Sequence, residues 1–326
     1  MDEASQSEPA ISVNAGTAPL LAELLKDAAA LQIKPIALPG GAVAVDAGID
    51  VAGGLEAGRR IAEICMGGLG RVALVASASA WPVSVSVTCS NPVIACLACQ
   101  YAGWSLSAGE GKARFQALGS GPARALARKE PLFAELGYQD TAAASCLVLE
   151  VDKLPPAEIV AKVARDCGLA EAALTFVLTP TRSLAGLVQI VARVVEVALH
   201  KAHALGFPLA AIRDAAGHAP VPPPSRDFLS AMGRSNDAIL FAGVVQLYVD
   251  CDDGAASELA QRLPSAASRD FGKPFAQVFK DSGFDFYKID PHLFAPAAVV
   301  VTNLASGRSF RGGEVNQDLL ATSFAG

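Results

Sequence analysis

Five polar residues near the middle of the chain are spaced as one stripe along a helix. They are Gln189, Arg193, Glu196, His200 and His203, which follow one another at intervals of four, three, four and three residues. At roughly 100° per residue, this spacing predicts that all five side chains fall within an arc of about 80°. Almost every other residue of the predicted helix 181–205 is apolar, so only the stripe needs water or a polar partner.

Two interpretations of this stripe are open from its pattern. On a solvated edge, Arg193 and Glu196 would form an i,i+3 ion pair that contributes at most roughly 0.5 kcal/mol. In the interior, the stripe would line a cleft, because a helix that is apolar over most of its circumference is typical of a protein core.

A turn of small residues before a predicted helix is a second candidate site. Gly119 and Gly121 flank Ser120 and would let the backbone approach a ligand closely. Free N–H groups at a helix start attract anions, and Arg124 would add a fixed positive charge. A plain turn and helix cap is the alternative. The dinucleotide-binding fingerprint is incomplete, because Arg124 stands where it requires a third glycine.

The cysteines favour buried thiols over a metal centre. Cys96 and Cys99 form a CxxC pair among seven cysteines, but no second pair follows at ligand spacing and all four histidines lie beyond residue 199. A zinc deaminase would need an H-x-E motif upstream of P-C-x-x-C, and the chain has none. We therefore expect no metal.

Composition describes a globular protein of one or two domains. The 326 residues are 52% hydrophobic and 18% charged, which argues against extended disorder. The net charge of −6 comes without a basic cluster, so nucleic acid is not an expected partner.

The chain also lacks the expected signs of export or membrane insertion. Residues 1–10 are acidic and polar, unlike a signal peptide, and we expect a flexible tail on a cytoplasmic protein. No charged residue lies between Arg71 and Glu110, but the alternation VSVSVT at 83–88 is typical of a strand, so we expect no membrane span.

Helices and strands alternate along the rest of the chain, which predicts an α/β or mixed α+β fold. The Pro-rich segment 217–224 is the candidate crossover between two lobes. The predicted helices are 18–31, 55–65, 91–103, 157–167, 181–205, 255–262 and 274–280, and the predicted strands are 43–46, 72–77, 82–88, 144–151, 174–179, 238–250 and 297–303.

The sequence resembles methenyltetrahydromethanopterin cyclohydrolase over essentially the whole chain after the first ten residues. Five stretches taken together carry the resemblance: CMGGLG at 65–70, SGPARAL at 120–126, SLAGLVQIVARVVEVAL at 183–199, MGRSND at 232–237 and DFYKIDPHLFAPA at 285–297.

The resemblance implies an enzyme of one-carbon metabolism, in methylotrophy or methanogenesis, that reversibly hydrolyses the cyclic methenyl cation of tetrahydromethanopterin, or of its dephospho form, to the formyl derivative. It also implies a homotrimer without metal or prosthetic group. Each subunit would be one family unit, 11–326, with two lobes at 11–150 and 151–326 and the active site in a deep cleft between them.

The family's catalytic arginine and glutamate match Arg193 and Glu196. Glu196 would then act as general base and acid on water, oriented by Arg193. We further expect the substrate to be bound by Ser120, Gly121, Arg124, Gln189 and His200. A non-catalytic protein that binds the pterin carrier is the alternative of another class.

Overall fold

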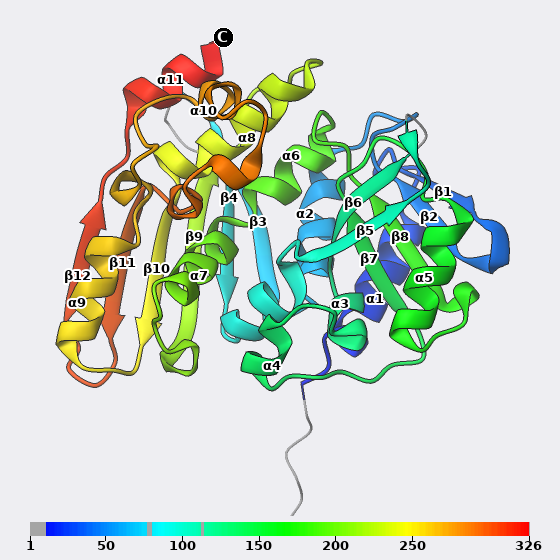
Figure 1. The fold of residues 1–326 in the computed structure, drawn as a ribbon, viewed down its shortest axis with the longest axis horizontal. Coiled ribbons are helices and arrows are strands. Elements are labelled where there is room, and N and C mark those ends of the chain that lie inside the picture. The colour runs from blue at the N-terminus through cyan, green and yellow to red at the C-terminus, as the bar shows by residue number, and fades with distance from the viewer. Residues whose placement is uncertain (1–10, 77–79, 112–113, 326) are drawn as a thin grey trace, which may run out of the picture.

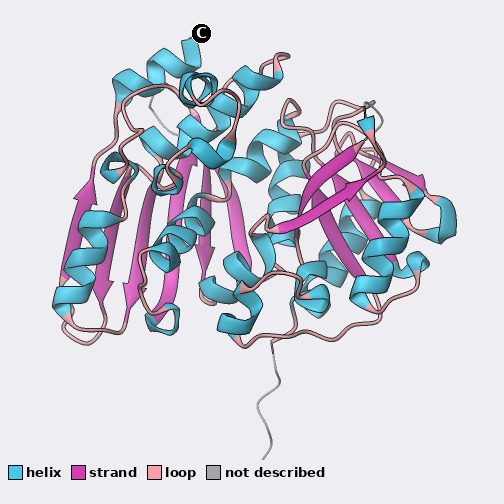
Figure 2. Ribbon diagram, in the orientation of Figure 1, coloured by secondary structure: helices cyan, strands magenta, loops and turns pink. Residues whose placement is uncertain are grey.

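The strands form two separate six-stranded sheets, packed with helices (Figures 1 and 2). The computed structural model describes residues 11–76, 80–111 and 114–325, so the predicted tail 1–10 lies outside the described residues. Both sheets are mixed, which confirms the α/β class with a sheet and helices in each part.

The first sheet has helices on both faces. Its order is β1 (Lys34–Ala37), β2 (Val43–Asp46), β8 (Leu174–Leu178), β7 (Ser145–Leu149), β6 (Phe115–Ser120) and β5 (Trp104–Ala108), with β2, β8 and β7 parallel. Along β7, Cys146 and Val148 face the core of α1 (Val13–Lys26) and α2 (Leu55–Cys65), whereas Leu147 and Leu149 face α5 (Ala157–Cys167). Burial on both faces explains the uninterrupted apolar run of this strand.

The second sheet has helices over one face. Its order is β12 (Ser309–Gly313), β11 (Ala298–Asn303), β10 (Val244–Val249), β9 (Ile212–Pro220), β4 (Val83–Cys89) and β3 (Gly70–Ala76). Along β10, Val245 and Leu247 are buried in the core beneath the helices. Helix α7 (Val194–Ala204) contacts β9 and β10, and α9 (Asp253–Arg262) contacts β11 and β12 (Figure 1). Gln246 and Tyr248 point to the opposite face and keep partial exposure.

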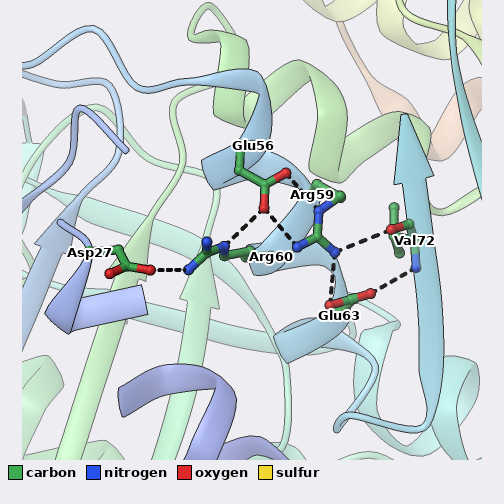
Figure 3. A network of polar contacts seen from close by, with 6 residues as sticks. All are labelled: Asp27, Glu56, Arg59, Arg60, Glu63 and Val72. Atoms are coloured by element: carbon green, nitrogen blue, oxygen red, sulfur yellow. Dashed lines mark hydrogen bonds and ion pairs between the residues drawn. The ribbon is translucent and has the colours of Figure 1, made fainter. Parts of the chain in front are cut away.

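Helix α2 connects the two sheets through a network of polar contacts (Figure 3). The guanidinium of Arg59 donates to the carbonyl of Val72 on β3, and the N–H of Val72 donates to Glu63 over 3.0 Å. Arg60 donates to Asp27 at the end of α1 over 2.7 Å. The network therefore ties one helix to the edge of the second sheet and to the first sheet's helical layer.

The other helices of more than four residues pack on these elements. They are the π-helix η2 (Val93–Gln100), α3 (Ala123–Ala127), α4 (Leu132–Leu136), α6 (Leu184–Val191), α8 (Phe228–Ala242), α10 (Phe275–Asp281) and α11 (Gln317–Ala325). Among the described residues, no helix has both the length and the apolar content that crossing a bilayer requires.

Two predictions about the C-terminal half were wrong. Residues 238–242 end the helix α8, and only 244–249 form the strand β10, because a short buried apolar run does not by itself distinguish helix from strand. Segment 217–224 is not a crossover between sheets, since β9 and β10 are neighbours in one sheet.

The strands of the two sheets interleave along the chain. The hairpin β3–β4 comes early in the sequence but belongs to the second sheet, and β7 and β8, on either side of residue 150, are adjacent in the first. Sheet membership thus does not follow the tentative lobes 11–150 and 151–326.

Candidate active site

Three strands of the first sheet terminate at the same end of the sheet, which is called its carboxyl edge below because two of them are parallel strands. Because β7 and β8 are parallel, Glu150 and Thr181 follow them at the same end of the sheet. The antiparallel strand β6 ends there too, since Ser120 pairs with Val148. Ligands of open α/β sheets characteristically bind beyond the carboxyl ends of parallel strands, so this edge is where a site is expected.

Arg193 reaches this edge from the junction of α6 and α7. Its Nη2 donates to the hydroxyl of Ser120 over 3.0 Å, and its Nη1 donates to the carbonyl of Gln100, the last residue of η2, over 2.8 Å. Helix α7 itself packs on β9 and β10 of the second sheet. Arg193 therefore bridges the two sheets.

Glu196 lies one turn further along α7 and is only 4% exposed. Its Oε2 is 3.7 Å from Nη1 of Arg193, a distance that allows strong electrostatic attraction without a good hydrogen bond. Burial raises the pKa of Glu196 to about 7, against the opposing effect of the charges of Arg193 and Arg124. A carboxyl group with a pKa in this range can both accept and return a proton near neutral pH.

The predicted continuous helix 181–205 was wrong in one respect, because it is broken at Ala192 and Arg193. The side-chain amide of Gln100 donates to the carbonyl of Ala192 over 3.2 Å, and that carbonyl would otherwise accept a helical bond. The break places Arg193 at the start of α7, where its side chain can reach Gln100 and Ser120.

Arg124 is fully buried, and its guanidinium is occupied by other parts of the chain. Nη1 donates to the carbonyls of Leu97 and Cys99 over 3.0 and 3.1 Å, while Nε and Nη2 both bond the carboxylate of Glu130. The ring of Tyr101 lies 5.3 Å from its guanidinium carbon. These contacts hold η2 and α3 together, and a contact with substrate remains a prediction.

The turn at Gly121 is also used within the fold. Its φ of +100° favours glycine, and its N–H donates to the carbonyl of Cys99 over 2.8 Å, so this donor is not free for an anion. Ser120 contributes to the site through its hydroxyl, which accepts from Arg193 and lies 3.4 Å from the sulfur of Cys65.

Gln189 and His200 occupy different surroundings. Gln189 is buried, and neither polar atom of its amide has a hydrogen-bond partner among the described residues. His200 stacks on Tyr101 with ring centroids 4.7 Å apart, and burial lowers its pKa and favours the neutral ring. His203 instead pairs with Glu135 over 2.6 Å.

Sequence reasoning missed three residues near Arg193 and Glu196, namely Gln100, Tyr101 and Glu150. Gln100 and Tyr101 end an apolar segment that carries no motif, so nothing in the sequence marked them. Glu150 could have been noticed, because it is the first charged residue after a buried strand. The hydroxyl of Thr181 donates to Oε1 of Glu150.

The CxxC pair belongs to the core. Cys96 and Cys99 are buried free thiols, and burial is the main reason that the pKa of each is raised well above its usual range. In the part of the chain that the structure describes, no three His, Cys, Asp or Glu side chains gather as they would around a metal ion.

The predicted deep cleft between lobes is not established by the geometry. Hollows of about 520 and 440 Å³ lie among residues 269–289 and beside residues 90–94 and 209–213, and neither includes the catalytic candidates. Glu196 and Arg193 are nonetheless enclosed rather than on open surface, with side-chain exposures of 5% and 14%. The surface ion pair is therefore excluded as an interpretation of the polar stripe.

A buried carboxylate of raised pKa beside a guanidinium is suited to proton transfer near neutral pH, as an enzyme that carries out acid–base chemistry requires. The chain matches the family model described as "Cyclohydrolase (MCH)" over residues 12–324, and it belongs to this family.

Relatives in bacteria and archaea are similar over nearly their whole length. The chain is 58% identical over 315 residues to the methenyltetrahydromethanopterin cyclohydrolase of Methylobacillus flagellatus, covering 96% of this chain and 95% of that one. It is 56% identical to the enzyme of that name from Xanthobacter autotrophicus, with 98% and 94% covered. The archaeal enzyme of Methanothermobacter marburgensis is 41% identical, with 96% and 99% covered.

Proposed function

We propose that the protein hydrolyses the methenyl group of tetrahydromethanopterin, or of its dephospho form, with Glu196 as general base and Arg193 as the residue that orients it. The family and the shared name of its relatives supply the reaction, methenyltetrahydromethanopterin cyclohydrolase activity in one-carbon metabolism. The observation that carries the mechanism is the enclosed pair, in which Glu196 lies 3.7 Å from Arg193 and is 4% exposed.

The reaction needs a placed water and a proton acceptor. The methenyl carbon lies between two nitrogens of a cationic amidinium and is already electrophilic, so we propose that no metal or prosthetic group takes part. As water forms the new C–O bond, Glu196 accepts its proton. It then returns this proton to the departing ring nitrogen as the C–N bond breaks, and the proton left on the new hydroxyl is released to solvent as the C=O bond forms, so the products are the formyl derivative and one proton.

Arg193 would act by charge and by position. It is the strongest influence that lowers the pKa of Glu196, against the burial that raises it. Ser120 and the carbonyl of Gln100 fix the guanidinium, so the carboxylate meets a charge held in one place.

The other predicted site residues are proposed as substrate contacts. The unpartnered amide of Gln189 and the stacked ring of His200 are suited to polar and aromatic parts of a pterin, respectively. Gly121 and Arg124 have many contacts within the fold, so their part would be to shape the wall near Ser120.

We also propose that the enzyme is a cytoplasmic homotrimer. The face of the second sheet opposite its helices carries partly exposed residues such as Val244, Tyr248 and Val300. The same face carries Gln246 and Thr302, and a partly exposed sheet face of apolar and polar residues is suited to contact between subunits. Sedimentation analysis would test the trimer.

A non-catalytic protein that binds the pterin carrier is not favoured. A protein that only binds a cation could use a carboxylate of ordinary pKa. The pKa of Glu196 is instead raised to about 7, which suits proton transfer near neutral pH.

The test follows the absorbance of the methenyl chromophore. The wild-type protein should bleach methenyltetrahydromethanopterin, and Glu196→Gln should bind it yet lose turnover by on the order of 10² to 10⁴, the usual share of a general acid–base. Asp237→Asn is a matched control, since Asp237 is also buried with a pKa of about 7 but lies between α8, α10 and α11. Near-normal turnover in Glu196→Gln would remove Glu196 from the mechanism.

A further inference from the structure

A second carboxylate lies beside the catalytic pair and takes no part in the mechanism above. Glu150 is the first residue after β7, and the positive charge of Arg193 acts on its carboxyl. The two side chains form no direct ion pair among the described residues, because the N–H groups of Arg193 point to Gln100, Ser120 and Glu196. Glu150 is therefore a neighbour of Arg193 and not its anchor.

Only one oxygen of the Glu150 carboxylate has a hydrogen-bond partner among the described residues. Oε1 accepts from the hydroxyl of Thr181, and Oε2 has no hydrogen-bond partner within the described residues. Thr181 follows β8 in the chain and is buried. Its hydrogen bond therefore fixes the direction in which the free oxygen of Glu150 points.

The surroundings of Glu150 are unusual for a surface acid. Its side chain is exposed, yet desolvation by the surrounding protein is the largest influence on its carboxyl and raises its pKa. Strand pairing places Glu150 near the candidate pair, because Leu149, the residue before it, lies opposite Gly119, which precedes the Ser120 that Arg193 contacts. Asp152, two residues on, is 69% exposed and lies 3.9 Å from Arg182, as an ordinary surface acid does.

A pterin carries hydrogen-bond donors that the carboxylate of Glu150 could accept. Its aminopyrimidinone edge carries two adjacent donors, a ring N–H and an exocyclic amino group. Paired N–H donors match carboxylate oxygens in the same way as the fork of an arginine does. One donor would bond Oε2, and the other would bond Oε1, which can accept a second hydrogen bond beside that from Thr181. An acceptor that is already held in place by Thr181 loses little freedom when it binds such an edge.

We propose that Glu150 is a substrate-binding residue whose carboxylate accepts hydrogen bonds from the aminopyrimidinone edge of the pterin and so sets the methenyl carbon opposite Glu196. This inference rests on the proposed function, and it adds the residue that orients the ring. Arg193 then lies between a carboxylate that binds and a carboxylate that reacts.

The experiment compares Glu150→Gln with Asp152→Asn, which removes an acidic side chain from the same segment. Glu150→Gln should raise KM roughly 10- to 100-fold, the range for a lost hydrogen bond to a charged group, with kcat within about 3-fold of wild type. Asp152→Asn should leave both constants unchanged. Thr181→Val should raise KM less than Glu150→Gln does, because the carboxylate remains but is no longer held.

A second measurement separates edge recognition from attraction of the substrate's positive charge. The neutral ring compound 6-methylpterin carries the edge without the cation or the tail, and its affinity, followed by fluorescence, should fall in Glu150→Gln by the same factor as KM rises. An unchanged affinity for 6-methylpterin would overturn the proposal. So would a normal KM with a lowered kcat and a shifted pH midpoint, which would mean that Glu150 acts through Arg193.

Failure of the proposed function is recognised separately. If the wild-type protein does not bleach the methenyl chromophore, the reaction is wrong, while the affinity for 6-methylpterin still decides the role of Glu150. Thermal melting of each variant establishes that it is folded, and Thr181→Val provides the test if Glu150→Gln is not.

Discussion

Two enclosed arginines near the same turn have opposite surroundings. Arg124 is fully buried and meets a carboxylate through Nε and Nη2, two backbone carbonyls through Nη1, and the ring of Tyr101. Arg193 meets one carbonyl and one hydroxyl, and its carboxylate neighbour Glu196 stays 3.7 Å away. Both residues were predicted for the site from sequence, but only Arg193 keeps charge that the fold has not neutralised at short range.

The difference shows how a buried guanidinium can serve stability or chemistry. Pairing with Glu130 offsets much of the cost of burying Arg124, and the pair then fastens η2 to α3. Neutral acceptors hold Arg193 in place without cancelling its charge, so that charge acts on Glu196 and on what binds there.

The largest expected difference between the two arginines is in their replacement by lysine. A lysine cannot reproduce the fork that meets Glu130 and two carbonyls, so Arg124→Lys should lower the free energy of unfolding by about 3 kcal/mol and leave the folded fraction active. Arg193→Lys should lower kcat on the order of 10²-fold with little loss of stability. Urea unfolding and the absorbance assay measure the two effects, and equal effects of the two substitutions would contradict the distinction.

The pH dependence of turnover should distinguish the two arginines further, through their effects on the pKa of Glu196. In the proposed mechanism, hydrolysis requires ionised Glu196, whose pKa is raised to about 7, so the rate should fall roughly tenfold per pH unit below that value. Arg193 lowers this pKa more than Arg124 does. The midpoint of the residual activity should therefore move to higher pH in Arg193→Met and move less in Arg124→Met, and a larger shift for Arg124→Met would reverse our assignment.

The smallest expected effect concerns the support of Arg193. Ser120→Ala removes the acceptor of Nη2 while the bond from Nη1 to Gln100 remains. We expect kcat to fall about fivefold, in line with the roughly 1 kcal/mol of one hydrogen bond, with KM nearly unchanged. A rise in KM alone would mean that Ser120 contacts substrate directly and does not work through Arg193.

The reliability of prediction from sequence varied along the chain for physical reasons. Strand 43–46 and helices 55–65 and 157–167 were predicted with the observed boundaries, because glycine or proline punctuates their ends and their periodicity is strong. Residues 238–242 lack such periodicity, being apolar on all sides, and their helix was missed.

The sequence by itself determined the family and the α/β class, and it placed Arg193 and Glu196 on one stripe of a helix, since residue types at helical spacing survive any arrangement of the elements. Only the tertiary structure decided that the central helix breaks at Arg193, that Arg124 is neutralised by Glu130, and that Glu150 comes to lie beside Arg193. Each of these depends on groups far apart in the chain: Gln100 captures the carbonyl of Ala192, and parallel strands bring their ends to one edge. The spacing of residues along the sequence cannot predict such contacts, because they form only when the two sheets are in place.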